Sequence, residues 1–205
     1  MRPYNPNRVH YLFRFFWDYS GGQMTNWGAH HLDIAQWALG MDESGPIECS
    51  ATASYNAEGL YEVPERQHMT YKYANGLTVL CGQQYKMGCT FEGEHGTIYV
   101  DRNKLEVKPD SLLKDVPQKE YEAKYKTGQS HVANWLECIK SREKPNADVA
   151  IGHRTATVCH LGNIAVRTGR TIRWDPQSEQ IVGDSDAAAQ LTRSYRKPWE
   201  LPSIA

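Results

Sequence analysis

One short stretch of the sequence carries side chains that could move a proton. It opens with Gly21 and Gly22 and then places Asn26, His30 and Asp33 at spacings of four and three residues. On a helix, these spacings put the three side chains on one face. An imidazole titrates near neutral pH, so it can take or give a proton, and a nearby carboxylate can orient it or bind a hydroxyl group. The pattern therefore favours acid–base chemistry beside a glycine turn.

Each of these side chains also has a structural interpretation. His30 could satisfy a buried hydrogen bond beneath a sheet, and Asp33 could cap or pair on the helix surface. Asn26 cannot act as a base, because its amide only donates or accepts hydrogen bonds, so it could only orient His30 or donate to a ligand oxygen. His31 lies about 100° around the helix from His30, which favours packing or a contact between subunits. We expect His30 to be the main catalytic side chain, with Asn26 in a supporting role.

An aromatic segment before the glycine pair supplies candidate binding groups. Aromatic faces cover the C–H surfaces of sugars, and charged groups hold their hydroxyls. Trp17 and Tyr19 could form such a surface, although aromatic residues more often belong to a core. Arg14 lies within the aromatic run, and because an unpaired buried charge is costly, it needs a partner or a ligand. We expect Arg14, Trp17, Tyr19 and Asp33 to bind the substrate.

The elements that position these side chains follow from patterning and turn residues. We predict a strand over residues 11–17 because its side chains are mostly aromatic. The helix after the glycine pair is predicted to begin with a cap from Thr25 or Asn26. It is predicted to run to Leu39 and to stop at Gly40, since glycine adopts the left-handed conformation that ends many helices.

Alternating residues and turn signals predict the rest of the secondary structure. Asn75-Gly76 is a hairpin turn between strands 67–73 and 77–81, and a second hairpin is expected around Gly93–Gly96. Further strands are expected at 48–56, 89–92, 97–100, 105–107 and 171–174. Helices are expected at 131–141 with a cap from Ser130, within 147–168 with a stop at Gly169, and near 187–193, while 108–129 is expected to be a surface loop.

Together these elements predict one α+β domain over residues 1–205. It contains a large, mostly antiparallel β-sheet with helices on one face and no Rossmann half. Residues 1–20 would form an N-terminal strand and arm, 21–175 the sheet and its helices, and 176–205 a C-terminal arm.

The stretch from Gly21 to Asp33 resembles the G-G-x-x-x-D-x-x-x-H-x-x-D segment that opens the C-terminal domain of the Gfo/Idh/MocA oxidoreductases. These include glucose–fructose oxidoreductase and inositol dehydrogenase. The sequence departs from the motif at Asn26, where the family usually has aspartate, and the likeness extends loosely through 135–139 and 174–176. The resemblance implies a domain that follows a nucleotide-binding half, supplies the substrate pocket and often forms oligomers through the open face of its sheet. It also implies that a lysine from the nucleotide-binding half shares the work of His30.

The sequence lacks the usual dinucleotide-binding fingerprint. It contains no G-x-G-x-x-G turn after a strand and no acidic residue about 20 positions further on. Glu143-Lys144-Pro145 matches the tripeptide that carries the family's catalytic lysine, but it falls between two late helices, so we interpret it as a helix end followed by a loop. We therefore expect NAD or NADP to act only through a missing N-terminal half, and no cofactor on this chain alone.

Three functions remain open from these observations. The first is the substrate-binding and oligomerising domain of an NAD(P)-dependent sugar or polyol dehydrogenase, which would not be a competent dehydrogenase alone. The second is a non-catalytic binding or assembly module. The third is a cofactor-independent sugar lyase or hydrolase that uses His30 and Asp33 as acid and base. The expected partners are a small sugar or polyol and further copies of the chain.

Composition argues against several other classes. The 205 residues, 40% of them hydrophobic, suit one domain with a sizeable core. A formal charge of −1 gives no electrostatic basis for binding nucleic acid or an anionic membrane, and no apolar run approaches the roughly 20 residues of a membrane helix. The five cysteines include no C-x-x-C pair, so we expect reduced thiols and a cytoplasmic protein. The histidines show no metal-ligand spacing, so no metal site is expected.

Overall fold

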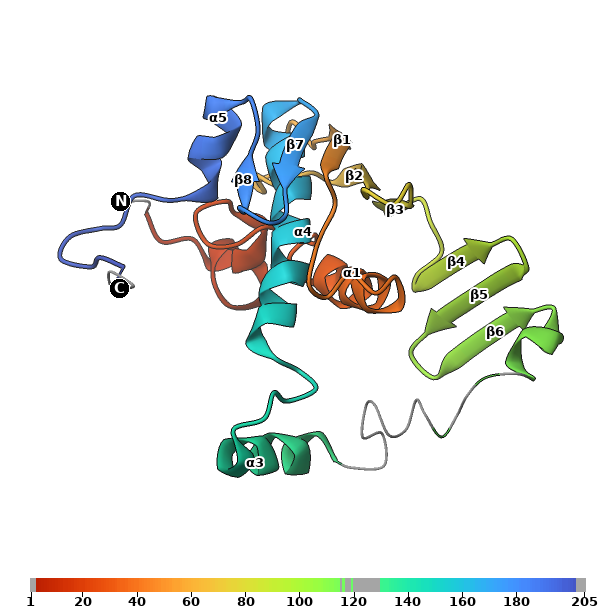
Figure 1. Ribbon diagram of the computed structural model, residues 1–205. Coiled ribbons are helices and arrows are strands. Elements are labelled where there is room, and N and C mark those ends of the chain that lie inside the picture. Colours follow the sequence, from red (N-terminus) through yellow and green to blue (C-terminus); the bar gives the residue numbers. More distant parts are fainter. Residues whose placement is uncertain (1–2, 115, 117–118, 120–129, 202–205) are drawn as a thin grey trace.

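The computed structural model describes residues 3–114, 116, 119 and 130–201 (Figure 1). Its helices are α1 Trp27–Ala38, α3 His131–Ser141, α4 Val149–Thr168 and α5 Ser185–Ala188, with 3₁₀ helices η1 Pro6–Arg8, η2 His10–Phe15, η3 Asp110–Leu113 and η4 Ala189–Leu191. Its strands are β1 Glu48–Ser54, β2 Arg66–Lys72, β3 Thr78–Gly82, β4 Cys89–Gly93, β5 Gly96–Asp101, β6 Lys104–Lys108, β7 Ile172–Asp175 and β8 Gln180–Ile181. Much of the surface loop expected at 108–129 lies outside the described residues.

The strands form antiparallel sheets, which confirms the predicted α+β class. One sheet has the order β3-β2-β1-β7-β8 and the other β4-β5-β6. Both predicted hairpins are confirmed, because β2 pairs with β3 across Asn75-Gly76 and β4 pairs with β5. The strands do not continue as one broad sheet, since β3 and β4 are not neighbours in either sheet. Between them the chain turns away at Gly88, whose φ of 104° favours glycine, and the smaller sheet stands beside α1 in Figure 1.

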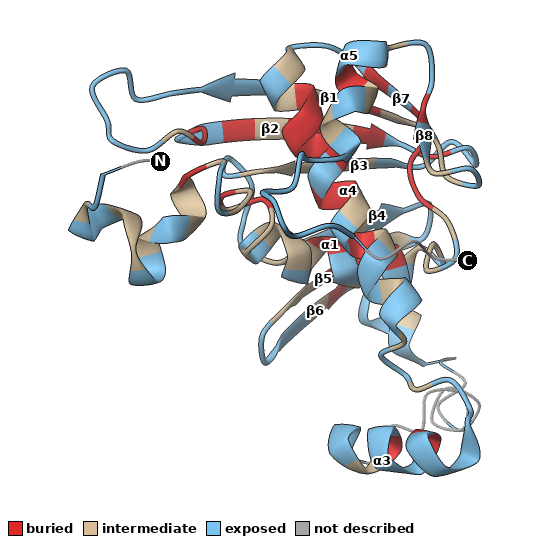
Figure 2. Cartoon of the chain, turned by 90° about the vertical axis from the view of Figure 1, so that its left-hand side faces the viewer, coloured by how far each residue is buried: buried red, intermediate tan, exposed pale blue. Residues whose placement is uncertain are grey.

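The core lies between the larger sheet and α4. Along β2 the side chains alternate, so Met69 and Tyr71 are fully buried while His68 and Thr70 point to the opposite face. Figure 2 shows α4 crossing in front of β1 and β2. Buried residues of α4 such as Val158 and Leu161 belong to the same core cluster as Met69 and Tyr71. Gly162 of α4 permits this approach, because a side-chain carbon at that position would overlap the hydroxyl oxygen of Tyr71.

The other face of the larger sheet carries His68, the ion pair of Glu48 with Lys72, several small polar side chains and one leucine. The small polar residues and the leucine are half-buried or exposed, and they are Ser50, Thr52, Thr70, Thr78 and Leu80. Among the described elements, the core cluster of α1, α4 and α5 packs on the opposite side. This arrangement agrees with the expectation of helices on one face.

The end of α1 is fixed by a buried polar residue. Gln36 accepts a hydrogen bond from the Tyr73 hydroxyl at 2.5 Å and donates to the carbonyls of Met41 and Ser44 at 3.0 and 3.2 Å. Because a buried amide is costly without partners, these three bonds explain why a glutamine is tolerated in the core. Gly40, with φ 68°, follows the last turn, as predicted.

The predicted strand at residues 11–17 was wrong. Residues His10–Phe15 form η2, and the segment bonds locally, with the amide of Phe16 donating to the carbonyl of Phe13 at 3.2 Å. Only the side chain of Phe16 is fully buried there. Aromatic residues favour strands only where a partner strand is available. In the described structure, none of the sheets includes this segment.

Helix α3 is amphipathic and leaves its apolar face exposed. Its predicted cap is confirmed, because the Ser130 hydroxyl accepts a hydrogen bond from the amide of Ala133 at 3.1 Å. Figures 1 and 2 show α3 apart from the sheets. Its exposed apolar residues recur at helical spacing, and they are Val132, Trp135, Leu136 and Ile139. The helix ends at Ser141, so Glu143–Pro145 lies in a loop, as predicted.

All five cysteines are free thiols, and three of them are fully buried. Burial raises the pKa of Cys81 and Cys89 to about 11 and that of Cys159 to about 12. Below pH 8 these thiols are neutral in both folded and unfolded chains. As the pH rises above the ordinary thiol pKa of 9.0, the unfolded chain loses these protons first.

We therefore expect the free energy of unfolding to fall between about pH 9 and pH 11, and we expect slow thiol labelling of the folded chain at about pH 8. Urea unfolding across this pH range and labelling with an aromatic disulfide reagent measure the two effects. Labelling of all five thiols at the rate of the urea-unfolded chain would contradict the expectation.

In the described part of the chain, no helix combines the length and the apolar composition needed to cross a membrane.

Candidate functional site

The glycine turn before α1 is held against α4. Gly22 has φ 68° and donates its amide to the carbonyl of Arg14 at 2.9 Å. The Gly21 carbonyl accepts a hydrogen bond from Nδ2 of Asn163 at 2.9 Å, and a side-chain carbon on Gly21 would lie only 2.5 Å from that nitrogen. Asn163 is almost completely buried. Gly21 is therefore needed for close approach to α4, and Gly22 for its left-handed backbone.

The predicted caps of α1 are not formed by side chains. Thr25 instead accepts the amide of Gly21 at 3.1 Å, so it closes the glycine turn. Asn26 occupies the N-cap position without a side-chain cap bond, and its Nδ2 donates to Oε1 of Gln23 at 3.3 Å. Both side chains therefore bond to residues of the turn, Gly21 and Gln23, and not to amides of the first helical turn.

His30 lies on the exposed face of α1 with its imidazole unpaired. Within the described residues, neither ring nitrogen has a hydrogen-bond partner, and the ring meets Trp27 edge-on with a 6.1 Å centroid distance. This geometry does not support the interpretation of His30 as a buried structural histidine. The imidazole is free to bond a ligand.

Asp33 projects from the same helix toward α4. Its Oδ1 accepts a hydrogen bond from the buried hydroxyl of Thr155 at 2.8 Å. The residue as a whole is exposed. One oxygen therefore joins the two helices, and the geometry gives the carboxylate a fixed position rather than a bond to the His30 ring.

The aromatic segment is anchored at its backbone. The Trp17 amide donates to Glu62 at 3.1 Å, and the guanidinium of Arg167 on α4 lies 5.2 Å from the centre of the Trp17 ring. Arg193 of the C-terminal tail donates to the carbonyls of Trp17 and Asp18 at 2.5 and 2.8 Å. The C-terminal tail therefore lies beside the N-terminal segment, as Figure 1 shows.

The Arg14 and Tyr19 side chains differ in their contacts with the rest of the chain. The Arg14 guanidinium lies 3.6 Å from the centre of the Tyr11 ring and donates to the Tyr11 carbonyl at 2.9 Å. This local pairing explains why the charge is tolerated in an aromatic run. Tyr19 is exposed and its ring meets the buried Phe16 edge-on at 6.3 Å.

The structure links the candidate residues through α4, which sequence reasoning did not include in the site. Thr155, Asn163 and Arg167 of this helix contact Asp33, Gly21 and Trp17 in turn. One signal was present in the sequence, because Asn163 interrupts an otherwise apolar run from Leu161 to Val166. The tail residue Arg193 carried no such signal.

The other side of α1 faces a mostly apolar hollow of about 690 Å³ between α1, β3 and β4. His31 lines it and stacks on Trp27 with a centroid distance of 6.0 Å, which agrees with its expected packing role. His30 is not among its lining residues. In the part of the chain that the structure describes, no group of three metal-ligating side chains is placed to hold an ion.

A sequence model of one oxidoreductase family, described as its C-terminal alpha/beta domain, matches residues 1–201. The chain belongs to the Gfo/Idh/MocA oxidoreductase family. This confirms the resemblance of the Gly21–Asp33 motif. A comparison with curated protein sequences gave no match.

Solved structures of similar fold include three bacterial proteins. The WlbA dehydrogenase from Bordetella pertussis, in complex with NADH and UDP-GlcNAcA, is 19% identical with a TM-score of 0.57, over 79% of this chain and 50% of that chain. The aldose-aldose oxidoreductase from Caulobacter crescentus, complexed with glycerol, is 19% identical with a TM-score of 0.54, over 78% and 50%. An NAD-binding protein from Listeria innocua is 16% identical with a TM-score of 0.53, over 83% and 55%. At these identities the likeness shows the fold alone, and the chain spans about half the length of these relatives.

Proposed function

We propose that this chain is the substrate-binding and oligomerising domain of an NAD(P)-dependent sugar or polyol dehydrogenase. The observation that carries the proposal is the His30 imidazole, which is unpaired within the described residues on a helix whose start is bonded to α4. Family membership supports the reaction class. The relatives with NADH, UDP-GlcNAcA and glycerol in their crystals support a small polyhydroxylated substrate.

In the proposed reaction, His30 accepts the proton of a substrate hydroxyl. The hydride on the carbon that bears this hydroxyl would pass to a nicotinamide held outside this chain. The substrate alcohol becomes a carbonyl, and the imidazole becomes an imidazolium. The His30 side chain is exposed and its ring nitrogens have no partner within the described residues, so the histidine can return the proton to water after each turnover. Asp33 keeps its second oxygen for a substrate hydroxyl, while its first stays on Thr155.

The residues of this chain do not form a binding site for the nicotinamide dinucleotide that would accept the hydride. The sequence has no G-x-G-x-x-G turn to receive a pyrophosphate. We therefore assign cofactor binding to another half of the protein. The bare apolar face of α3 supports this assignment, because a further domain would bury the side chains of Trp135 and Leu136.

We also propose that copies of the chain associate through the open face of the larger sheet. Small hydroxyl side chains such as Thr70 and Ser50 keep part of this face low, and Leu80 adds apolar area. The Glu48–Lys72 pair on the same face offers both charges to a second copy. The alternative of an assembly module without catalysis makes the same prediction for association. It differs in predicting no role for His30.

Binding measurements on the 205-residue chain test the proposal. We expect calorimetry to show no binding of NADH, and binding of a sugar or polyol from a panel of methyl glycosides and inositols that is lost in His30→Ala. Light scattering of the same samples should show an oligomer. Tight NADH binding would contradict the assignment of the cofactor to another half, and a chain that binds no member of the panel would favour the assembly module.

A further inference from the structure

The N-terminal segment forms a second, open hollow of about 660 Å³. This volume falls within the range of about 300–1,000 Å³ that is usual for small-molecule sites. Its walls carry three aromatic rings, from Tyr4, Phe13 and Tyr19. Polar side chains of Asn5, Arg8, His10 and Asp18 also line it.

The ring of Phe16 contacts two of the residues that line this hollow. Its ring is fully buried, the guanidinium of Arg8 lies 5.4 Å from its centre, and Tyr19 packs edge-on against it. Arg8 donates one hydrogen bond to the Pro3 carbonyl at 3.2 Å, and its Nε has no partner among the described residues. The Phe16 ring therefore holds the Arg8 guanidinium and the Tyr19 ring, which both line the hollow, in fixed positions relative to each other.

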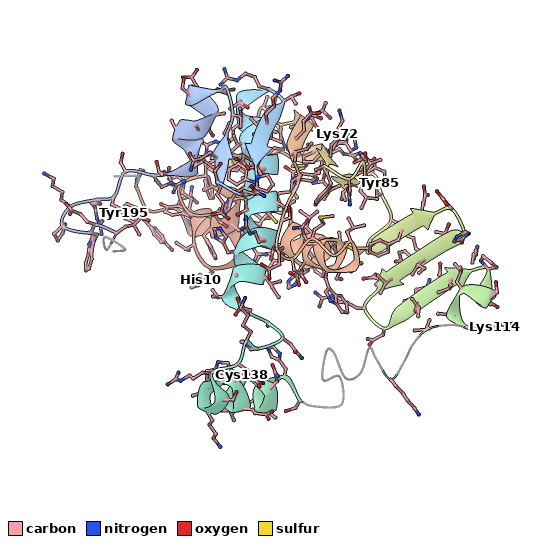
Figure 3. The ribbon with its side chains drawn as sticks, viewed as in Figure 1. His10, Lys72, Tyr85, Lys114, Cys138 and Tyr195 are labelled. Atoms are coloured by element: carbon pink, nitrogen blue, oxygen red, sulfur yellow. The ribbon has the colours of Figure 1, made fainter. Side chains whose placement is uncertain are left out.

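The C-terminal tail bonds to the segment that carries the lining residues Asp18 and Tyr19. Arg193 bonds the carbonyls of Trp17 and Asp18, and the Tyr19 amide donates to the Phe16 carbonyl at 2.9 Å. Figure 3 shows His10 and the tail residue Tyr195 on the same side of α4, while Tyr85 lies on the other side. Because these bonds join segments that are distant in sequence, Asp18 and Tyr19 are ordered before a ligand binds. Less conformational entropy is therefore lost on binding.

We propose that this hollow binds a saccharide residue of a glycoside or an oligosaccharide. A pyranose ring presents apolar C–H faces and a rim of hydroxyls, and the hollow offers aromatic faces and both donors and acceptors. A phosphorylated ligand fits less well, because among the described lining residues the guanidinium of Arg8 is accompanied by the carboxylate of Asp18. The inference rests on the proposed sugar dehydrogenase for its link to catalysis, but the binding itself does not require His30.

Calorimetry or saturation-transfer NMR on the 205-residue chain tests this with methyl glucosides and the trisaccharides maltotriose, cellotriose and chitotriose. We expect at least one trisaccharide to bind about tenfold more tightly than the methyl glycoside. Tyr19→Ala combined with Phe13→Ala should remove most of that gain, since each aromatic contact contributes about three- to tenfold. Tyr85→Ala is the matched control, because it removes an exposed tyrosine on the other side of α4.

The outcomes separate this inference from the proposed function. If trisaccharides bind no more tightly than methyl glycosides, or equally well after both aromatic substitutions, the hollow is not a saccharide site. If the trisaccharide gain is lost in Tyr19→Ala with Phe13→Ala but persists in His30→Ala, the hollow is supported independently of the dehydrogenase assignment, which the turnover of His30→Ala tests separately. If no saccharide in the panel binds at all, the inference is overturned.

Discussion

His30→Ala is expected to lower the kcat of the complete dehydrogenase by about 10²- to 10⁴-fold, which is the usual contribution of a positioned general base. The fold should be unaffected, because the His30 ring is exposed and its recorded ring contact is an edge contact with Trp27. The measurement is the rate of nicotinamide reduction at saturating substrate, with circular dichroism and thermal unfolding of both proteins.

His95→Ala is the matched control for that experiment. His95 is also an exposed histidine, but it lies in the turn between β4 and β5, away from α1. We expect it to keep full activity. If His30→Ala retains wild-type turnover, His30 is not the base. If it is inactive only because it unfolds, His30→Gln provides a second test that retains a polar side chain of similar size.

The second large effect concerns the packing of α4 on the sheet. Gly162→Ala is expected to destabilise the chain by about 1–3 kcal/mol relative to Gly152→Ala in the same helix. A methyl group at 162 would overlap the Tyr71 hydroxyl, whose ring is fully buried and cannot swing away, whereas nothing lies within 4 Å of a methyl group at 152. Both substitutions gain the same helix propensity, about 1 kcal/mol, so their difference isolates the packing cost.

Tyr71→Phe supplies the complementary control. The Tyr71 hydroxyl is buried and has no hydrogen-bond partner among the described residues, so its removal should cost little. In the double variant the methyl group at 162 gains room, and urea unfolding should recover most of the lost stability. Equal stability of Gly162→Ala and Gly152→Ala would show that α4 does not approach the sheet as closely as described.

The motif that led to the candidate site was readable because its features are local. The spacing of His30 and Asp33 depends only on the geometry of one helix, and the stop at Gly40 depends only on one backbone conformation. The hairpin at Asn75-Gly76 and the Ser130 cap were predictable for the same reason.

Contacts between distant segments decided the rest. The aromatic run at 11–17 became η2 because a strand requires a partner, and residues close in sequence do not specify one. The break between β3 and β4, which leaves two sheets, likewise depends on pairings that no short pattern reports.

The site itself was only half visible in the sequence. The residue types of His30, Asn26 and Asp33 indicated proton chemistry, but their surroundings are supplied by α4, more than 120 positions later, where Thr155 and Asn163 bond to Asp33 and Gly21. The sequence by itself determined the family, the helix that carries His30 and most strand boundaries, because these rest on short-range spacing. Only the tertiary structure decided which face of α1 is exposed. It also decided which residues bond to the glycine turn and to the segment from Trp17 to Tyr19, because each of these contacts depends on side chains that folding brings together.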